Sequence, residues 1–119
     1  MKYKMGDIIF ASEALKKNET DSVKSHLFVL IDDDGNVVPA DYFGFVVSSN
    51  LSKSNKNSFF KYNEEIKKNN NNNLHVDSIV KCDQLMQIPS SNINKKIGEV
   101  DEDDLMRFLN AFGNYLNED

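Results

Sequence analysis

Short apolar runs separated by turn residues recur along most of the chain. Residues 26–31 (HLFVLI) form a continuous apolar run that ends in aspartates, a glycine and an asparagine, and residues 42–48 (YFGFVVS) are rich in aromatic and β-branched side chains. Residues 7–10 (DIIF) and 77–88 (DSIVKCDQLMQI) have a similar apolar content, and Pro89 terminates the second of them. Runs bounded by turn chemistry predict β-strands that are at least half buried. Weaker strand signals occur at residues 37–38, 59–62 and 93–100.

Polar stretches between these runs predict surface loops. Residues 12–24 and 49–57 show no apolar period, and the run of asparagines at residues 69–73 predicts a mobile loop tip. Glycines interrupt two of the strand segments, and a glycine inside a strand is typical of a bulge or a bend. We therefore expect irregular strand pairing at Gly44 and Gly98.

The end of the chain carries the clearest helical signal. Asp101 stands where it could cap a first turn, and the acidic residues 102–104 favour the positive end of a helix dipole. The pattern predicts an amphipathic helix packed on the core. Its apolar stripe consists of Leu105, Phe108, Leu109, Phe112 and Leu116.

Several short strands followed by one helix define the expected fold class. They argue for a mainly β or α+β protein, a small SH3-like β-barrel with a C-terminal amphipathic α-helix, and against a parallel βαβ unit. A length of 119 residues suits a single domain that spans residues 1–119.

Composition narrows the expected cellular setting. No apolar run approaches the ~20 residues that a membrane-spanning helix requires, so we expect no membrane association. The N-terminal segment lacks the continuous apolar stretch of a signal peptide, and the single cysteine, Cys82, suits a reducing compartment. These features predict a cytoplasmic protein in which Cys82 is a small core residue. One cysteine and two histidines argue against a Cys- or His-rich metal site, and we expect no metal and no cofactor.

The charge balance is unfavourable for nucleic-acid binding over the whole surface but leaves room for a local site. The net charge is −5, whereas phosphate contacts normally require a basic surface. The signs are segregated, however, with acidic residues at 99–104 and lysines in the middle of the chain. That segregation permits an anion-binding face on an acidic protein. The central lysines are Lys53, Lys56, Lys61, Lys67, Lys68 and Lys81.

Several large enzyme classes lack their sequence motifs here. The chain contains no G-x-G-x-x-G, no Walker lysine after glycines, no H-E-x-x-H and no G-x-S-x-G. Dinucleotide binding, P-loop chemistry, zinc-protease chemistry and an α/β-hydrolase nucleophile elbow are therefore unsupported.

The most informative segment is residues 77–88, which resembles the late strand of toxins of the MazF, PemK and Kid type. In that family a D-S-V start leads into R-C-D-Q, and the corresponding residues here are Lys81, Cys82, Asp83 and Gln84. The acidic-capped terminal helix matches as well, so the resemblance covers nearly the whole chain. Three further segments resemble, in order, the family's G-D-I opening, its R-P-V-V-I-I strand and its A-I-T-S strand end: residues 6–9, 26–31 and 46–49.

This resemblance implies a fold, an activity and partners. It implies a homodimeric MazF- or CcdB-like barrel that cleaves single-stranded RNA without a metal, as an mRNA interferase, and that a cognate antitoxin inhibits. In such a reaction RNA supplies its own nucleophile, the 2′-hydroxyl. The protein then needs a base for that hydroxyl, an acid for the leaving 5′-oxygen and cations for the phosphorane charge.

The resemblance also suggests catalytic roles for four residues. Lys81 and Asp83 are two positions apart on one strand and share a face, which suits a charge-stabilising or proton-transfer pair. Ser48 can donate to a phosphate oxygen. His26 stands at the start of the second strand, where the family usually has an arginine, and is the acid–base candidate. Contacts to RNA are expected from Lys24, Ser49, Lys53, Lys56 and Gln84.

Structural interpretations of the same residues stay open. Lys81 and Asp83 could form an ion pair on a solvated sheet face, Ser48 could end a strand, and His26 could be a capping or core residue. His75, which follows the asparagine run, is interpreted as a surface residue. A different functional class also stays open, because a lysine does not reproduce the missing arginine fork. In that case the chain is a catalytically weak or inactive SH3-like barrel that binds a peptide or a nucleic acid.

Overall fold

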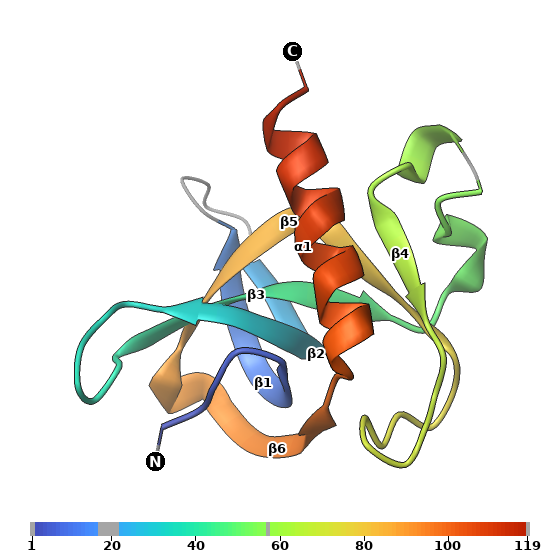
Figure 1. Cartoon of the computed structure of the whole chain (residues 1–119). Helices are drawn as coiled ribbons and strands as arrows, with labels where there is room; N and C mark the ends of the chain where they lie inside the picture. The colour runs from blue at the N-terminus through green and yellow to red at the C-terminus, as the bar shows by residue number, and fades with distance from the viewer. Residues whose placement is uncertain (1, 17–21, 57, 119) are drawn as a thin grey trace.

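The computed structural model describes residues 2–16, 22–56 and 58–118, and these contain six β-strands and one α-helix (Figure 1). The predicted class, a mainly β protein with one C-terminal helix, is confirmed. The strands are β1 (Asp7–Lys16), β2 (Ser22–Asp33), β3 (Asp41–Ser48), β4 (Asn63–Ile66), β5 (Ser78–Pro89) and β6 (Ile93–Glu99). The helix is α1 (Glu102–Leu116), and the 3₁₀ turns are η1 (Leu51–Lys53), η2 (Ser58–Phe60) and η3 (Ser90–Asn92).

The strands form one antiparallel sheet that closes partly on itself. Their order is β4-β5-β3-β2-β1-β6. An additional pairing joins the end of β1 to β5, with Leu15 opposite Gln87. This pairing links β1, β2, β3 and β5 into a ring, while β4 and β6 extend the sheet beyond it (Figure 1). A barrel-like ring, as expected from the sequence, is therefore present in part.

Alternation of side chains along the curved strands produces two cores. One core consists of residues from the four ring strands, including Phe28 and Met86. The other core includes α1, whose Phe108 packs with residues such as Val29 and Cys82. Neighbouring residues such as Phe28 and Val29 belong to different cores because successive strand side chains point to opposite faces. Cys82 is fully buried, as predicted.

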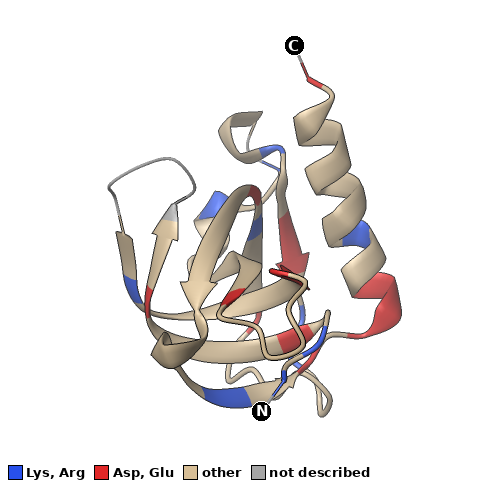
Figure 2. Ribbon diagram, turned by 90° about the vertical axis from the view of Figure 1, so that its left-hand side faces the viewer, with Lys and Arg blue, Asp and Glu red and all other residues tan. Residues whose placement is uncertain are grey.

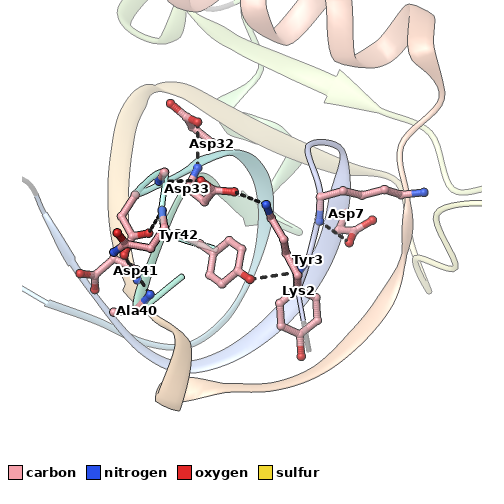
Figure 3. Close-up of polar contacts among 12 residues, drawn as sticks. Lys2, Tyr3, Asp7, Asp32, Asp33, Ala40, Asp41 and Tyr42 are labelled. Atoms are coloured by element: carbon pink, nitrogen blue, oxygen red, sulfur yellow. Dashed lines mark hydrogen bonds and ion pairs between the residues drawn. The ribbon is translucent and has the colours of Figure 1, made fainter. Parts of the chain in front are cut away.

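Aspartate side chains organise the connection between β2 and β3 (Figure 3). Asp34 Oδ2 accepts hydrogen bonds from the amides of Ala40 at 2.8 Å and Asp41 at 3.0 Å. Asp33 Oδ1 accepts from the amide of Gly35 at 2.8 Å, and Gly35 has a φ of +82°, which a glycine adopts without steric cost. The predicted turn after residues 26–31 is thus confirmed. Its carboxylates are occupied by backbone groups.

Both glycines predicted to perturb strands lie at irregular pairings. The β2–β3 register shifts beside Gly44, and the β1–β6 register shifts beside the pair formed by Ile8 and Gly98. A Cβ atom on Gly44 would lie 2.5 Å from the carbonyl oxygen of Val29. A Cβ atom on Gly98 would lie 2.5 Å from the carbonyl oxygen of Asn72. Close approach of another backbone explains both glycines.

Several local predictions are wrong. The weak strand signal at 37–38 falls on bends in the connection between β2 and β3. Much of the predicted loop at 12–24 is a β1–β2 hairpin, in which Glu13 pairs with Lys24, while residues 17–21 lie outside the described residues. Many side chains of this hairpin are exposed, so its sequence shows no apolar period although its backbones pair. The predicted strand at 59–62 is instead η2 and a turn, and the strand that pairs with β5 there is β4. The predicted loop at 49–57 contains η1, and its residue 57 lies outside the described residues.

The asparagine run at 69–73 is bonded into the fold, so the prediction of a mobile loop tip is wrong. The side chain of Asn72 is fully buried. Its Oδ1 accepts from the amides of Asn69 and Leu74, both at 3.0 Å, and its Nδ2 donates to the carbonyl of Lys67 at 2.9 Å. Asparagine amides replace backbone partners in tight turns, which is why a polar run can form ordered structure.

The same run holds the start of α1. Asn69 and Asn71 donate from Nδ2 to the carboxylate of Asp101 at 3.0 and 2.8 Å. Asp101 occupies the N-cap position of α1, but its side chain makes no capping hydrogen bond. The predicted position of the cap is therefore right, while its carboxylate binds the asparagines instead of the helix amides.

The chain's only arginine fixes the middle of α1 to β4. Figure 2 shows that α1 begins with acidic residues and carries a basic residue further along. Arg107 donates to the Glu64 carboxylate at 3.0 Å, to the Glu65 carbonyl at 2.7 Å and to the Asp104 carboxylate at 2.8 Å. The predicted amphipathic helix is confirmed, with Phe108 and Ala111 buried against the sheet. In the described part of the chain, no helix has the length and apolar content needed to cross a membrane.

Candidate functional site

A cleft of about 310 Å³ lies where four segments of the chain meet. Its lining consists of Phe10 on β1, residues 25–27 on β2, residues 47–49 at the end of β3 and residues between 74 and 78 before β5. Among the described residues, His26 and His75 are the only ionisable side chains in this lining. The structure therefore brings the predicted residues His26, Ser48 and Ser49 together in one cavity.

The backbone around His26 fixes its imidazole. Ser25 has a φ of +51°, which residues other than glycine rarely adopt, and it interrupts the ladder between the Ala11–His26 pair and the next pair. His26 Nδ1 lies 2.8 Å from the carbonyl oxygen of Lys24. Because a carbonyl oxygen can only accept, this bond requires a proton on Nδ1. In the neutral ring, Nε2 then carries the free lone pair and can accept a proton.

Ser48 is placed beside His26 by the strand register. Leu27 and Val47 form the last pair of the β2–β3 ladder at this end, and His26 and Ser48 directly adjoin that pair. The Ser48 hydroxyl oxygen accepts from the Asn50 amide at 3.2 Å, which leaves the hydroxyl proton available for a ligand.

Lys81 and Asp83 do not line the cleft. Ser48 pairs with Ile79, so strand alternation puts Lys81 on the face shared by Ser48, as a diagonal neighbour. Diagonal Cβ atoms across strands are typically about 7–8 Å apart. Lys81 thus lies beside the cleft rather than in it, and Asp83 also lies outside the lining.

The surroundings of Lys81 form a small charged group. Burial lowers the pKa of the Lys81 ammonium, the positive charge of Lys53 lowers it further, and Asp83 acts in the opposite direction. Lys53 is held nearby because its carbonyl accepts from Asn63 Nδ2 at 2.9 Å, and Asn63 pairs with Lys81. Asp83 Oδ1 is buried and has no hydrogen-bond partner among the described residues. Lys53, Lys81 and Asp83, called the Lys81 group below, therefore place two positive charges and a carboxylate near one another on β5 and η1.

The other predicted RNA contacts are more scattered. Lys24 is exposed, and its ammonium lies 3.9 Å from the Glu13 carboxylate. Lys56 is exposed and Gln84 is half-buried, and neither lines the cleft.

His75 is the residue of the cleft that the sequence interpretation missed. It was expected on the surface, and it is indeed exposed, but it lines the same cavity as His26. No sequence motif links the two histidines. The composition gave the only signal, because the chain has just two histidines, one at the start of segment 26–31 and one just before segment 77–88.

A metal site of protein side chains is not apparent in the described ranges. Within residues 2–16, 22–56 and 58–118, no three His, Cys, Asp or Glu side chains are grouped so that they could hold a metal ion. The polar side chains in the lining of the cleft supply imidazole and hydroxyl groups.

Comparison with protein families gives one match over nearly the whole chain. A family model described as "PemK-like, MazF-like toxin of type II toxin-antitoxin system" matches residues 4–116. No curated protein gives a significant match.

Solved structures with similar folds include two mycobacterial proteins. An endoribonuclease from a mycobacterial species, solved in complex with its cognate antitoxin, superposes with a TM-score of 0.69 at 9% identity, covering 99% of this chain and 98% of that chain. The Mycobacterium tuberculosis toxin MazF-mt6 superposes with a TM-score of 0.57 at 17% identity, covering 95% of this chain and 98% of that chain. At these identities the similarity shows the fold, and the predicted MazF-like fold is confirmed.

Proposed function

Because the chain belongs to the family of PemK-like, MazF-like toxins of type II toxin-antitoxin systems, we propose that it is a metal-independent endoribonuclease that cleaves single-stranded RNA. The observation that carries this proposal is the state of His26. Its Nδ1 proton is fixed by the Lys24 carbonyl, so Nε2 is available as a base in a cleft that also holds Ser48. One structural neighbour is itself described as an endoribonuclease.

The proposed reaction uses the RNA 2′-hydroxyl as its nucleophile. His26 Nε2 removes the 2′-proton, and the 2′-oxygen attacks the adjacent phosphorus. Imidazole suits this role because it changes its charge between about pH 5 and 8, which a guanidinium does not do. The chain therefore replaces the family's usual arginine with a group that can exchange a proton.

Ser48 and the Lys81 group stabilise charge on the phosphate in this proposal. The Ser48 hydroxyl donates to a non-bridging phosphate oxygen. Lys81 and Lys53 attract the RNA backbone from beside the cleft, and Asp83 orients the Lys81 ammonium. Ser49 in the lining and the exposed Lys24, together with Lys56 and Gln84, extend the contact surface for the flanking nucleotides.

The proposal includes the expected partners and location. We expect a cytoplasmic homodimer whose activity a cognate antitoxin inhibits. Support comes from the family, whose members are described as toxins of type II toxin-antitoxin systems. It also comes from the mycobacterial neighbour that was solved with its antitoxin.

Cleavage of single-stranded RNA in excess EDTA tests the proposal. We expect the wild-type protein to cut the RNA in the chelator, and His26→Gln to lose that cleavage. The matched control is Asn94→Gln, an exposed residue of β6 outside the cleft, which is expected to cut like the wild type. RNA binding without cleavage by the wild type would support the non-catalytic barrel instead. Cleavage that stops in EDTA and returns with Mg²⁺ would contradict metal independence.

A further inference from the structure

The two histidines of the chain reach the same cleft from different parts of the fold. His26 is on β2, and His75 is in the connection between β4 and β5. No other ionisable side chain among the described residues lines this cavity. Two imidazoles that face one cleft can supply both proton transfers of a phosphodiester transesterification.

The proposed function needs a second acid–base group. Transesterification moves a proton away from the 2′-oxygen and requires a proton at the departing 5′-oxygen. His26 is suited to the first transfer because its Nδ1 proton is held by the Lys24 carbonyl and Nε2 is the open nitrogen. A hydroxyl such as that of Ser48 is a poor acid at neutral pH. The cleft leaves one candidate for the second transfer.

The local structure holds His75 at this position. Leu74, directly before it, is buried, and its amide donates to Asn72 Oδ1 at 3.0 Å. On the other side, Asp77 Oδ1 accepts from the Lys68 amide at 2.9 Å. The segment is therefore fixed at both ends of His75.

The His75 ring itself is open to a ligand. The residue is exposed and makes no hydrogen bond to another described residue, so both ring nitrogens are available. This differs from His26, where one nitrogen is already used. A rigid backbone that presents an unpartnered imidazole to a cavity suits a group that contacts substrate.

We propose that His75 is the general acid of RNA cleavage and that His26 is the general base. This inference rests on the proposed function. His26 Nε2 takes the proton from the 2′-hydroxyl, the 2′-oxygen forms a new bond to phosphorus, and the bond from phosphorus to the 5′-oxygen breaks. Protonated His75 gives its proton to that 5′-oxygen. The products are a 2′,3′-cyclic phosphate and a 5′-hydroxyl. His26 has then gained one proton and His75 has lost one, and proton exchange with solvent restores both imidazoles.

Changing the leaving atom separates the two roles. The wild type, His26→Gln and His75→Gln are compared in single-turnover cleavage of ordinary RNA and of the same RNA with sulfur in place of the scissile 5′-oxygen. A thiolate leaves without protonation, so it makes a general acid unnecessary. On ordinary RNA we expect each variant to be slower than the wild type by about 10²–10⁴-fold. On the sulfur-containing RNA we expect His75→Gln to approach the wild-type rate and His26→Gln to remain slow.

Two controls make the comparison interpretable. Asn70→Ser changes an exposed residue of the same connection that does not line the cleft, and it is expected to match the wild type on both substrates. Binding of a fully 2′-O-methylated RNA and the thermal melting temperature are expected to be unchanged in His75→Gln, which separates a loss of chemistry from a loss of binding or folding.

The inference is overturned if His75→Gln cleaves ordinary RNA at the wild-type rate, or if its defect is the same on both substrates. Rescue of Lys81→Met, but not of His75→Gln, by the sulfur-containing RNA would assign the acid to Lys81 and also overturn it. If the wild type itself leaves ordinary RNA intact, the proposed function fails first, and that result is visible without any variant.

Discussion

Two polar regions of the molecule use their side chains in opposite ways. Between α1 and β4, Arg107 binds the carboxylates of Glu64 and Asp104 and a backbone carbonyl. In the cleft, His26 uses one ring nitrogen and His75 uses none within the described residues. Mutually satisfied groups stabilise a fold, whereas unsatisfied groups facing a cavity are available to a ligand. The comparison separates structural polar residues from candidate functional ones.

The contrast also applies to the chain's only arginine. Arg107 contacts Glu64, Glu65 and Asp104 between the helix and β4, and it does not line the cleft. Under the proposed function, the cation and proton-transfer roles are therefore assigned to lysine and histidine.

Replacing His26 by glutamine should produce the largest effect. Glutamine can keep a hydrogen bond to the Lys24 carbonyl but cannot accept a proton, so cleavage should fall by about 10²–10⁴-fold. Because the side chain is exposed, the melting temperature should stay close to that of the wild type. Single-turnover RNA cleavage and thermal melting measure the two quantities. A melting temperature far below that of the wild type would show that His26 is needed for folding, like the residues around Arg107, and would contradict the distinction between the two regions.

Asn72→Ala should mainly reduce stability. The change leaves the Lys67 carbonyl and the amides of Asn69 and Leu74 without their buried partner, which should lower the free energy of unfolding by about 1–3 kcal/mol. Urea denaturation measures this change. Asn70→Ala, an exposed neighbour, is the control and should stay within about 0.5 kcal/mol of the wild type. Equal free energies of unfolding for the two variants would show that the hydrogen bonds of Asn72 do not stabilise the fold.

Arg107→Ala should reduce stability by a smaller amount. The guanidinium is partly exposed, so the loss should be roughly 1 kcal/mol after allowance for solvent screening. The rate of RNA cleavage per folded molecule should not change, because Arg107 lies outside the cleft. If fully folded Arg107→Ala cleaved RNA much more slowly than the wild type in single-turnover experiments, Arg107 would have a role in catalysis, which would contradict this assignment.

The pH dependence of the Glu99 contact should be the smallest effect. The pKa of the Glu99 carboxyl is lowered, mainly by its hydrogen bond to Lys4 and also by the positive charges of Lys4 and Lys96. A carboxyl whose pKa is lowered by folding stabilises the protein above its unfolded pKa, and this contribution disappears as the pH falls through the folded value. The melting temperature of Glu99→Gln should therefore be slightly below that of the wild type near pH 7, and the difference should disappear once the pH has fallen below the lowered pKa of the folded state. A difference that grows on acidification would contradict this sign.

The sequence predicts the elements whose side chains are segregated by burial. The apolar runs at 26–31, 42–48 and 77–88 correspond to β2, β3 and β5, and the helical stripe corresponds to α1. Burial on one or both faces creates these patterns, so they can be read without the fold. The asparagine run was missed because side-chain hydrogen bonds hold it, and the β1–β2 hairpin was missed because its few buried apolar residues, such as Ala14, follow no clear period.

The candidate site was predictable only in part. The resemblance to the toxin family led to His26, Ser48 and the Lys81 segment because each stands in a recognisable strand motif. His75 has no motif, since it comes from a connection whose position depends on the bonds of Asn72 and on the start of β5. Convergence of side chains from distant segments is a property of the fold and has no local sequence signal.

The proposed function depends on attack by the RNA's own 2′-hydroxyl, and removal of that one oxygen atom shows whether this attack occurs. An RNA substrate is prepared with a 2′-deoxy sugar only at the nucleotide preceding the cleaved bond and is incubated with the wild-type protein in EDTA. We expect the all-ribose RNA to be cut to products with a 2′,3′-cyclic phosphate and a 5′-hydroxyl, and the substituted RNA to stay intact at that bond. Cleavage of the substituted RNA at the same bond would contradict it, because the proposed nucleophile is then absent.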